Sequence, residues 1–326
     1  MKAMVYTRYG SPDVLELKEV EKPAPGDNQV LVKVHASSVN AFDWHVLRGK
    51  PAFIRLMGFG IRKPKYQILG ADIAGRVEAV GKNVNQFRPG DEIFGDVSGS
   101  GIGGFAEYVC AGQNALAAKP ESMTFEQAAA LPLAAVTALQ GLRDKGGIKS
   151  GQKALINGAS GGVGTFAVQI AKAFEAEVTG VCSTGKMDMV RELGADHVID
   201  YTREDFTKNG QQYDLIYAVN GYNSILAYKR ALSDRGIYVL AGGEMAQMYQ
   251  AMLLRPLFTL GGNKKVVNYV AQPNQKDLEF IAKLFEDGKV KAVIDRRYPL
   301  SEVPEAIRHL EEGHARGKTV ILIADD

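Results

Sequence analysis

Residues 153–186 read KALINGASGGVGTFAVQIAKAFEAEVTGVCSTGK, and this stretch decides the fold. It opens with Lys153–Asn157, a short apolar run typical of a buried strand. A glycine cluster follows, and apolar residues then recur at helical spacing over residues 165–175. A second strand is predicted at Glu177–Cys182. A strand, a glycine turn, a helix and a strand together make one βαβ unit of a parallel sheet.

The glycine cluster predicts a phosphate-binding turn. A pyrophosphate resting on a helix N-terminus needs bare backbone amides and no Cβ in its way. The spelling departs from the usual G-x-G-x-x-G pattern, since alignment on Gly161 and Gly164 puts Ala159 at the first glycine. A strand precedes the cluster and a helix follows it, which is the context that the pattern requires. We therefore expect dinucleotide binding, and the alternative is a purely structural glycine-rich turn.

The end of the second strand indicates which dinucleotide is bound. An Asp or Glu about 20 residues past the glycines would hydrogen-bond the adenosine ribose and favour NAD. This chain has Ser183 and Lys186 there, while Glu175 and Glu177 lie at the other end of that strand. A hydroxyl and an ammonium suit a 2′-phosphate, which a carboxylate would repel. We predict NADPH over NADH, the alternative being a solvated Lys186 at a helix start.

The composition limits the classes of partner. The chain of 326 residues is long enough for two domains, and its 39 basic and 37 acidic residues give a formal charge of +2. We therefore expect no nucleic-acid partner. No apolar run approaches the ~20 residues that span a bilayer, and the opening MKAMVYTRYG lacks the apolar core of a signal peptide. We expect a cytoplasmic protein with no membrane partner.

Secondary-structure patterns divide the chain. Residues 1–121 read as short strands between turns, which indicates a β-rich domain. Strands and helices alternate over residues 122–291, which predicts an α/β domain with a doubly wound parallel sheet. Residues 292–326 are too short to fold alone and are expected to complete the first domain. The apolar edge of the predicted last strand, Lys264–Val270, favours a homodimer in which two such strands pair.

Further motifs are spread over the whole chain. They run from the opening MKAMVYTRYGSPDVL through VNAFD at residues 39–43 and GADIAG at residues 70–75 to GADHVIDY at residues 194–201 and Gly317-Lys318. With these motifs and the glycine turn, the chain resembles the medium-chain dehydrogenase/reductase superfamily, in its zinc-free quinone oxidoreductase (zeta-crystallin-like) branch.

The resemblance implies a fold, a cofactor and a set of binding residues. Residues 1–121, completed by 292–326, would form a GroES-like catalytic domain, and residues 122–291 a Rossmann NADPH-binding domain, with the active site in the cleft between them. Tyr201 also fits by its place after the predicted strand His197–Asp200. The positions that the resemblance assigns to NADPH contact are Asn40, Thr137, Gly161, Gly162, Val163, Ser183, Lys186, Tyr201 and Lys318.

Departures from the metal-dependent members of this superfamily predict that the chain binds no zinc. Metal-dependent relatives carry a Gly-His-Glu motif, which here reads Gly70-Ala71-Asp72, and a cysteine that residues 40–48 lack. Their four-cysteine lobe is reduced to residues 96–104, which contain no cysteine. Zinc needs three or four N, S or O ligands, and His35 and His45 with Asp72 do not have such a spacing.

Chemistry without zinc suits activated acceptors. Zinc would be the Lewis acid that polarises an alcohol or ketone oxygen. Hydride transfer to a quinone, or to the β-carbon of an enone or enal, asks less of the protein, because a few hydrogen bonds can hold the enolate. We expect an NADPH-dependent quinone or enone oxidoreductase. The alternatives are a zinc-free NADP-dependent ketone or alcohol dehydrogenase and a non-catalytic NADPH-binding protein.

Three residues are candidates for oxyanion contact or proton delivery. Asn40 and Asp43 lie in the segment that the resemblance places under the nicotinamide, and His45 follows with a side chain that titrates near neutral pH. The alternatives are a structural turn cap for Asp43 and a loop histidine without a role for His45. Some relatives donate the proton from a tyrosine in this stretch, but this chain has Trp44 there and no tyrosine before Tyr66.

Two further segments are rich in apolar residues. Residues 51–68, PAFIRLMGFGIRKPKYQI, combine large apolar side chains with basic ones, which favours a lid over the substrate or, alternatively, packing against a partner subunit. Met245–Leu260 contains Arg255-Pro256, so it is not expected to cross a membrane. It is expected to line the cleft or a subunit contact.

Overall fold

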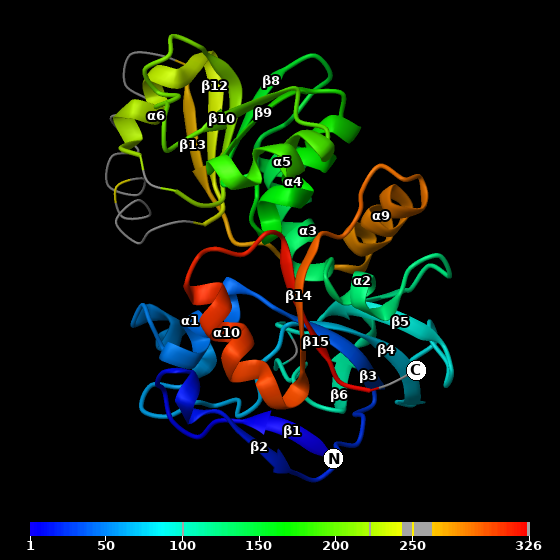
Figure 1. The fold of residues 1–326 in the computed structure, drawn as a ribbon. Coiled ribbons are helices and arrows are strands. Elements are labelled where there is room, and N and C mark those ends of the chain that lie inside the picture. Colours follow the sequence, from blue (N-terminus) through cyan, green and yellow to red (C-terminus); the bar gives the residue numbers. More distant parts are fainter. Residues whose placement is uncertain (100, 222, 243–249, 251–262, 325–326) are drawn as a thin grey trace. The chain divides into compact units, whose positions relative to one another are not determined.

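Two large β-sheets organise the chain, one parallel and one mostly antiparallel (Figure 1). The structure is a computed structural model that describes residues 1–326 except 100, 222, 243–249, 251–262 and 325–326. Residue contacts divide the chain into two units. Unit 1 comprises Met1–Val136, Gln272–Glu286 and Lys291–Asp326, and unit 2 comprises Thr137–Ala271 and Asp287–Val290.

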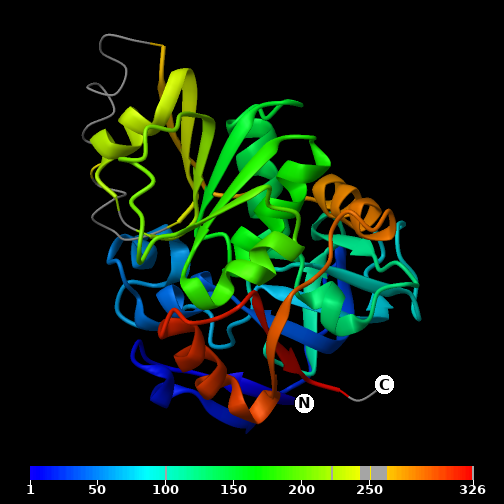
Figure 2. The same ribbon diagram turned by 45° about the horizontal axis from the view of Figure 1, so that its top comes forward.

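Unit 2 contains a six-stranded sheet in which neighbouring strands are parallel. Its strand order is β10-β9-β8-β11-β12-β13, the doubly wound 3-2-1-4-5-6 order of a Rossmann fold. The strands fan out with the usual twist in Figure 2. Their bounds are β8 (Lys153–Asn157), β9 (Glu177–Cys182), β10 (His197–Asp200), β11 (Tyr213–Ala218), β12 (Leu232–Leu240) and β13 (Lys265–Asn268).

Apolar side chains hold this sheet to its helices. Ala154, Leu155 and Ile156 of β8 are fully buried, as the apolar run of the sequence predicts. The helix that follows the glycine turn packs against β8 and β9, and the next packs against β9 and β10. The helices are α4 (Gly162–Ala173), α5 (Met187–Glu192) and α6 (Ile225–Ala231). The predicted α/β class with a doubly wound sheet is confirmed, and the predicted bounds of β8, β9 and β10 match the structure.

Unit 1 contains a seven-stranded sheet with the path β14-β15-β3-β4-β5-β7, and β6 pairs with β3 beside that path. A separate two-stranded sheet joins β1 and β2. This β-rich architecture is the predicted GroES-like domain. The strand bounds are β1 (Lys2–Val5), β2 (Glu16–Glu19), β3 (Gln29–Val39), β4 (Asp72–Val80), β5 (Glu92–Asp96), β6 (Tyr108–Gly112), β7 (Leu116–Ala118), β14 (Ile294–Pro299) and β15 (Lys318–Leu322).

Short helices accompany this sheet. Their bounds are α1 (Ala41–Arg48), α2 (Phe125–Ala129), α3 (Pro132–Leu139), α9 (Gln275–Glu286) and α10 (Val303–Glu311). α1 packs against α10, and Leu47 and Ile307 belong to the same apolar core. Thr124 stands three residues before Gln127, a spacing that predicts a capping box at the start of α2. The structure confirms it, since each side chain accepts the backbone N–H of the other residue.

The expected domain bounds, 1–121 with 292–326 and 122–291, stay a prediction. By their contacts, residues 122–136, 272–286 and 291 belong with unit 1. The physical reason is packing, because α2 lies against β3 and β4, and α9 lies against β7. Strand–helix alternation shows that these helices exist but does not show which sheet they cover.

The apolar pattern of the sequence predicts a strand over Gln29–Val34, and β3 continues five residues further, to Val39. The added residues include Ser37 and Ser38, whose hydroxyls are unfavourable in a buried strand unless they are hydrogen-bonded. Both hydroxyls donate to Asp72, at 2.6 Å to its backbone oxygen and 2.6 Å to its carboxylate. A partner on another strand therefore makes this extension possible, and it carries β3 to the start of α1.

The insertion at residues 51–68 contains a π-helical turn at Arg55–Phe59. Phe59 packs on the core of unit 1, with ring centroids 5.6 Å from Phe42 and 6.1 Å from Tyr66. The partly buried Phe59 ring therefore packs against that core, whereas the Phe53 side chain is 40% exposed. Among the described residues, no helix is long and apolar enough to cross a membrane. Apart from Gln250, the apolar stretch Met245–Leu260 lies outside the described residues.

Candidate functional site

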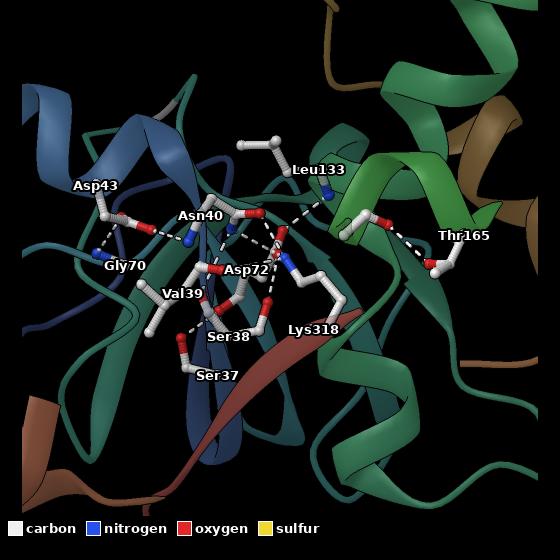
Figure 3. A network of polar contacts seen from close by, with 11 residues as sticks. Ser37, Ser38, Val39, Asn40, Asp43, Gly70, Asp72, Leu133, Thr165 and Lys318 are labelled. Atoms are coloured by element: carbon white, nitrogen blue, oxygen red, sulfur yellow. Dashed lines mark hydrogen bonds and ion pairs between the residues drawn. The ribbon is translucent and has the colours of Figure 1, made fainter. Parts of the chain in front are cut away.

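The candidate site of unit 1 is a buried polar network around Asp72 (Figure 3). Asp72 opens β4 and lies opposite Ser38 of β3. One carboxylate oxygen accepts hydrogen bonds from Ser38 Oγ at 2.6 Å and Asn40 Nδ2 at 2.8 Å, and it lies 3.2 Å from Lys318 Nζ. The other oxygen accepts the Leu133 N–H at 2.8 Å. Both oxygens of this buried carboxylate are therefore engaged by protein donors.

Lys318 supplies the positive charge of the network. It opens β15 and is only 3% exposed. Its ammonium donates to Asn40 Oδ1 at 2.5 Å, to the Val39 carbonyl at 3.3 Å and to Asp72. These partners use all three ammonium protons. A buried pair that loses one partner costs about 3–5 kcal/mol, so Lys318 and Asp72 depend on one another.

The network fixes the orientation of Asn40, which precedes α1. The Asn40 amide oxygen accepts from the Lys318 ammonium, and the amide nitrogen donates to the Asp72 carboxylate. The opposite orientation would place two donors together and two acceptors together. The side chain does not cap its own helix. Asn40 thus presents a defined polar group, only 6% exposed, at the N-terminus of α1.

Asp43 lies next to the network and binds backbone rather than its side chains. One carboxylate oxygen accepts the Asn40 N–H at 2.8 Å, and the other accepts the Gly70 N–H at 3.1 Å. Burial raises the pKa of Asp43 to about 7, although the two amides act in the opposite direction. The Asp43 carboxyl thus joins the start of α1 to the chain at Gly70, which agrees with the alternative of a structural turn cap.

Asp96 is a member of this region that the sequence analysis did not identify. It ends β5 directly opposite Asp72, it is buried, and one oxygen accepts the Ser98 N–H at 2.8 Å. Burial and the neighbouring charge of Asp72 raise the pKa of Asp96 to about 7. Nothing in the local sequence marks it, because its proximity to Asp72 comes from strand register.

His45 is not hydrogen-bonded to this network within the described residues. Its Nδ1 lies 3.0 Å from the Lys50 carbonyl, and its ring stacks on Trp44 with centroids 3.6 Å apart. Burial lowers the pKa of His45, so its ring is neutral near pH 7, with the Nδ1 proton donated to that carbonyl. Asp43 and His45 are two residues apart on α1 and therefore do not share a face.

The candidate site of unit 2 is the glycine turn between β8 and α4. Gly161 is the N-cap of α4, and Gly162 and Val163 begin the helix, where backbone N–H groups have no partner within the helix. Thr165 Oγ1 donates to the Gly162 carbonyl at 3.0 Å, which holds this first turn (Figure 3). Figure 3 shows Thr165 of this turn as well as the Asp72 network of unit 1.

The glycines of this turn serve different purposes. A Cβ on Gly164 would lie 2.0 Å from the Gly158 carbonyl oxygen, so the fold itself requires a glycine there. A Cβ on Gly161 would meet only that oxygen at 3.6 Å, an ordinary contact. The fold therefore does not require glycine at 161, whereas a phosphate close to the helix N-terminus would. The turn fits the phosphate group of a dinucleotide.

The ends of β9 and β10 lie side by side, and three more of the predicted cofactor-binding residues follow these two strands. Ser183 and Lys186 follow β9, and Tyr201, which is 63% exposed, follows β10 and donates its N–H to the Cys182 carbonyl at 3.1 Å. Thr137 lies elsewhere in unit 2, where its carbonyl accepts from Tyr217 at 3.1 Å and from Tyr269.

Asp200 is an acid at this edge that the sequence analysis did not take into account. It ends β10 opposite Cys182, although β9 itself ends without an acid, as expected. Thr184 and Thr202 donate to the carboxylate and lower the pKa of Asp200, and Arg203 lies 3.6 Å away. The charge at this edge therefore combines Asp200 with Lys186 and Arg203.

The described residues contain no group of three or more His, Cys, Asp or Glu side chains placed to hold a metal ion. At the position of the Gly-His-Glu motif, Ala71 offers no ligand atom and Asp72 is engaged as described above. The donor set at this place is that of an internal ammonium–carboxylate pair.

Comparisons with known proteins agree with this architecture. Residues 26–121 match the alcohol dehydrogenase GroES-like domain, and residues 193–321 match the zinc-binding dehydrogenase family model. The chain is 36% identical to the mitochondrial NAD(P)H oxidoreductase RTN4IP1 of Mus musculus, covering 98% of this chain and 89% of the relative. It is 35% identical to 2-methylene-furan-3-one reductase of Solanum lycopersicum, covering 98% and 79%.

A solved structure gives the same result in three dimensions. The quinone oxidoreductase of Coxiella burnetii superposes with a TM-score of 0.88 at 31% identity, covering 99% of each chain. Similarity at this level spans both the GroES-like and the Rossmann parts. The chain belongs to the medium-chain dehydrogenase/reductase superfamily, in its quinone oxidoreductase branch.

Proposed function

We propose that the protein is an NADPH-dependent oxidoreductase that transfers a hydride to a quinone or to an activated C=C bond. The similar proteins are named as an NAD(P)H oxidoreductase, a 2-methylene-furan-3-one reductase and a quinone oxidoreductase, which supports NAD(P)H as the cofactor and a small molecule as the acceptor. The choice of NADPH and the acceptor class are our proposals. When bound, NADPH supplies the hydride.

The observation that carries the acceptor class is the donor set around Asp72. Metal-dependent relatives use their motif at this position to hold a Lewis acid, whereas here the cation is the Lys318 ammonium, fully hydrogen-bonded by the protein. That ammonium has no proton left for a ketone oxygen, so it does not take the place of zinc as the polarising group. Acceptors that spread their charge into an enolate or hydroquinone need only a few hydrogen bonds.

The roles of the chain's own residues follow from this proposal. Gly161, Gly162 and Val163 bind the pyrophosphate through backbone amides, and Ser183, Lys186 and Tyr201 bind the adenosine ribose phosphate. The family resemblance adds Asn40, Thr137 and Lys318 as further cofactor contacts. Preference for the 2′-phosphate requires that Lys186 and Arg203 outweigh Asp200 at the edge where β9 and β10 end.

Among the candidates for oxyanion contact, the geometry favours Asn40 over Asp43 and His45. Asn40 presents an amide whose orientation is held by two charged partners, and one of its amide protons has only a long contact, 3.4 Å to the Ser38 carbonyl, which suits a preorganised polar contact. Asp43 uses its two oxygens on backbone amides, and the neutral His45 uses its Nδ1 proton on a carbonyl. We assign Asp43 a positioning role and propose no proton transfer by His45.

A substrate panel tests the proposal. Oxidation of NADPH is followed by absorbance with quinones, 2-alkenals, enones and simple ketones, and NADH serves as the matched cofactor control. We expect turnover with quinones or enones and little with simple ketones. Turnover confined to ketones would support the dehydrogenase alternative. NADPH binding without turnover of any acceptor would support the non-catalytic alternative.

The compartment also stays a prediction. RTN4IP1 of Mus musculus is named as mitochondrial, whereas a cytoplasmic location is our prediction for this chain. Fractionation of the native cells, with NADPH-dependent reductase activity as the marker, decides between them.

A further inference from the structure

An exposed apolar surface stands out on unit 1. Phe53, Leu56 and Ile61 are 40%, 73% and 66% exposed, and they lie within nine residues of one another. Other large apolar side chains with high exposure, such as Leu226 and Val270, are far from this segment in the sequence. We call the surface formed by Phe53, Leu56 and Ile61 the apolar tip. Single exposed apolar residues are ordinary on a protein surface, but three within nine residues of the chain are typical of a contact segment.

The rest of the protein holds the apolar tip in this exposed arrangement. Tyr9 OH donates to the carbonyls of Phe59 and Gly60, at 2.8 and 2.5 Å. Gly60 has a φ of +103°, and the Lys65 N–H closes the turn on the Phe59 carbonyl at 2.8 Å. The partly buried ring of Phe59 packs against the core, while Leu56 and Ile61, on either side of it in the chain, remain exposed. The tip is built to face outward.

Cations surround the tip in the sequence. The exposed residues Lys50, Arg62, Lys63 and Lys65 form no ion pair with any residue that the structure describes. Residues 44–71 contain no Asp or Glu. Arg48 is already paired with Glu311, and Arg55 is bound to the Gly49 carbonyl and the Tyr9 ring. We call Lys50, Arg62, Lys63 and Lys65 the basic rim, and of these Lys65 also lies over the Tyr66 ring, 5.0 Å from its centroid.

We propose that the apolar tip and its basic rim bind the surface of an anionic lipid bilayer. Apolar side chains on a projecting turn enter the interface, and lysine and arginine side chains reach the headgroup phosphates, as interfacial segments require. A second copy of the chain fits less well, because a two-fold contact through this surface would bring the two basic rims together. The proposal goes beyond hydride transfer and departs from our expectation, based on composition, of no membrane partner.

Co-sedimentation of the full chain with vesicles tests this proposal. Vesicles of phosphatidylcholine mixed with phosphatidylserine are compared with vesicles of phosphatidylcholine alone. We expect binding to the anionic vesicles only. Removing two cations in the variant Arg62→Gln/Lys63→Gln should weaken binding by at least about tenfold, since each cation near such a surface contributes about fivefold. Removing apolar contact in Leu56→Ser/Ile61→Ser should weaken it by a similar factor.

Matched controls remove the same groups elsewhere. Leu17→Ser/Leu226→Ser removes two exposed apolar side chains, and Arg235→Gln/Lys289→Gln removes one exposed arginine and one exposed lysine. Both controls should bind anionic vesicles as the wild type does, and fluorescence of the single residue Trp44 should show that every variant is folded.

Three results would overturn the proposal. The first is equal sedimentation of wild type with both kinds of vesicle, and the second is equal weakening in tip variants and controls. The third is a change of oligomeric state in Leu56→Ser/Ile61→Ser by sedimentation velocity without lipid, since that would make the tip a subunit contact. NADPH oxidation in solution is measured on the same variants. Whatever the turnover, NADPH binding by titration should be unchanged, because no proposed cofactor contact lies within residues 51–68, and this separates the proposal from the proposed reaction.

Discussion

At the scale of single residues, Gly161 and Gly164 separate folding from ligand binding. Gly164→Ala should destabilise the protein by about 1–3 kcal/mol, because the new Cβ would overlap the Gly158 carbonyl oxygen. Gly161→Ala should leave the free energy of unfolding within about 0.5–1 kcal/mol of wild type, since φ is −84° and the space is open. Urea unfolding measures both effects.

The same pair predicts opposite effects on the cofactor. Gly161→Ala should weaken NADPH binding in a fluorescence titration, because the methyl group would stand where the phosphate approaches the helix. A Gly161→Ala variant that is stable and binds NADPH as tightly as the wild type would show that no phosphate lies at this turn.

Lys186 carries the cofactor preference at the residue scale. Lys186→Ala should cost roughly 1.5–3 kcal/mol in NADPH binding, the scale of a hydrogen bond between charged groups, and leave NADH binding unchanged. The control is Lys149→Ala, an exposed lysine before the opposite end of β8. Equal dissociation constants of the wild type for NADPH and NADH, by titration calorimetry, would refute the assignment.

At the scale of secondary-structure elements, the facing strands β4 and β5 and the helix α1 hold three carboxyl groups near one buried ammonium. Burial raises the pKa values of Asp43 and Asp96 from 3.8 to about 7. The folded state therefore binds protons more tightly than the unfolded state between about pH 4 and pH 7. This contribution to stability is complete below about pH 4 and is lost as the pH rises through 7.

We therefore expect the free energy of unfolding to fall between about pH 5 and pH 8, by an amount of the order of 1 kcal/mol or more. Asp96→Asn should flatten this dependence while still accepting the Ser98 N–H. The exposed Asp188→Asn is the control and should keep the wild-type slope. Chemical denaturation at several pH values measures this, and an unchanged slope in Asp96→Asn would contradict the prediction.

At the scale of the whole molecule, β13 is the last strand of the six-stranded sheet in the described part of the chain. This edge carries apolar side chains that are not fully buried: Val267 in the strand is partly exposed, and Val270 just beyond it is 72% exposed. We predict a homodimer formed by two such edges. Val267→Lys/Val270→Lys should give monomers by light scattering, and Leu226→Lys should not. A wild-type monomer at micromolar concentration would refute this.

The sequence predicts the elements that local patterns encode. The βαβ unit around the glycine turn and the capping box at Thr124 are examples, because strand, helix and cap signals lie within a few neighbouring residues. Partners brought together by the tertiary fold could not be predicted. Asp96 meets Asp72 through strand register, and Ser37 continues β3 only because Asp72 accepts its hydroxyl proton. Likewise, Asp200 reaches the edge of β9 from the neighbouring strand.

The position of Lys318 in the chain also sets an order of events during synthesis. The ammonium binds Asn40, which lies 278 residues earlier, and Asp72, which lies 246 residues earlier. A ribosome-bound chain has made both of these residues long before it makes their cation, and chains emerge at about 5–20 residues per second. Until Lys318 is synthesised, the Asp72 carboxylate of the amino-terminal strands therefore lacks its ammonium partner. The GroES-like sheet closes only when the last strand arrives, so this half of the molecule is completed after translation of the nucleotide-binding half.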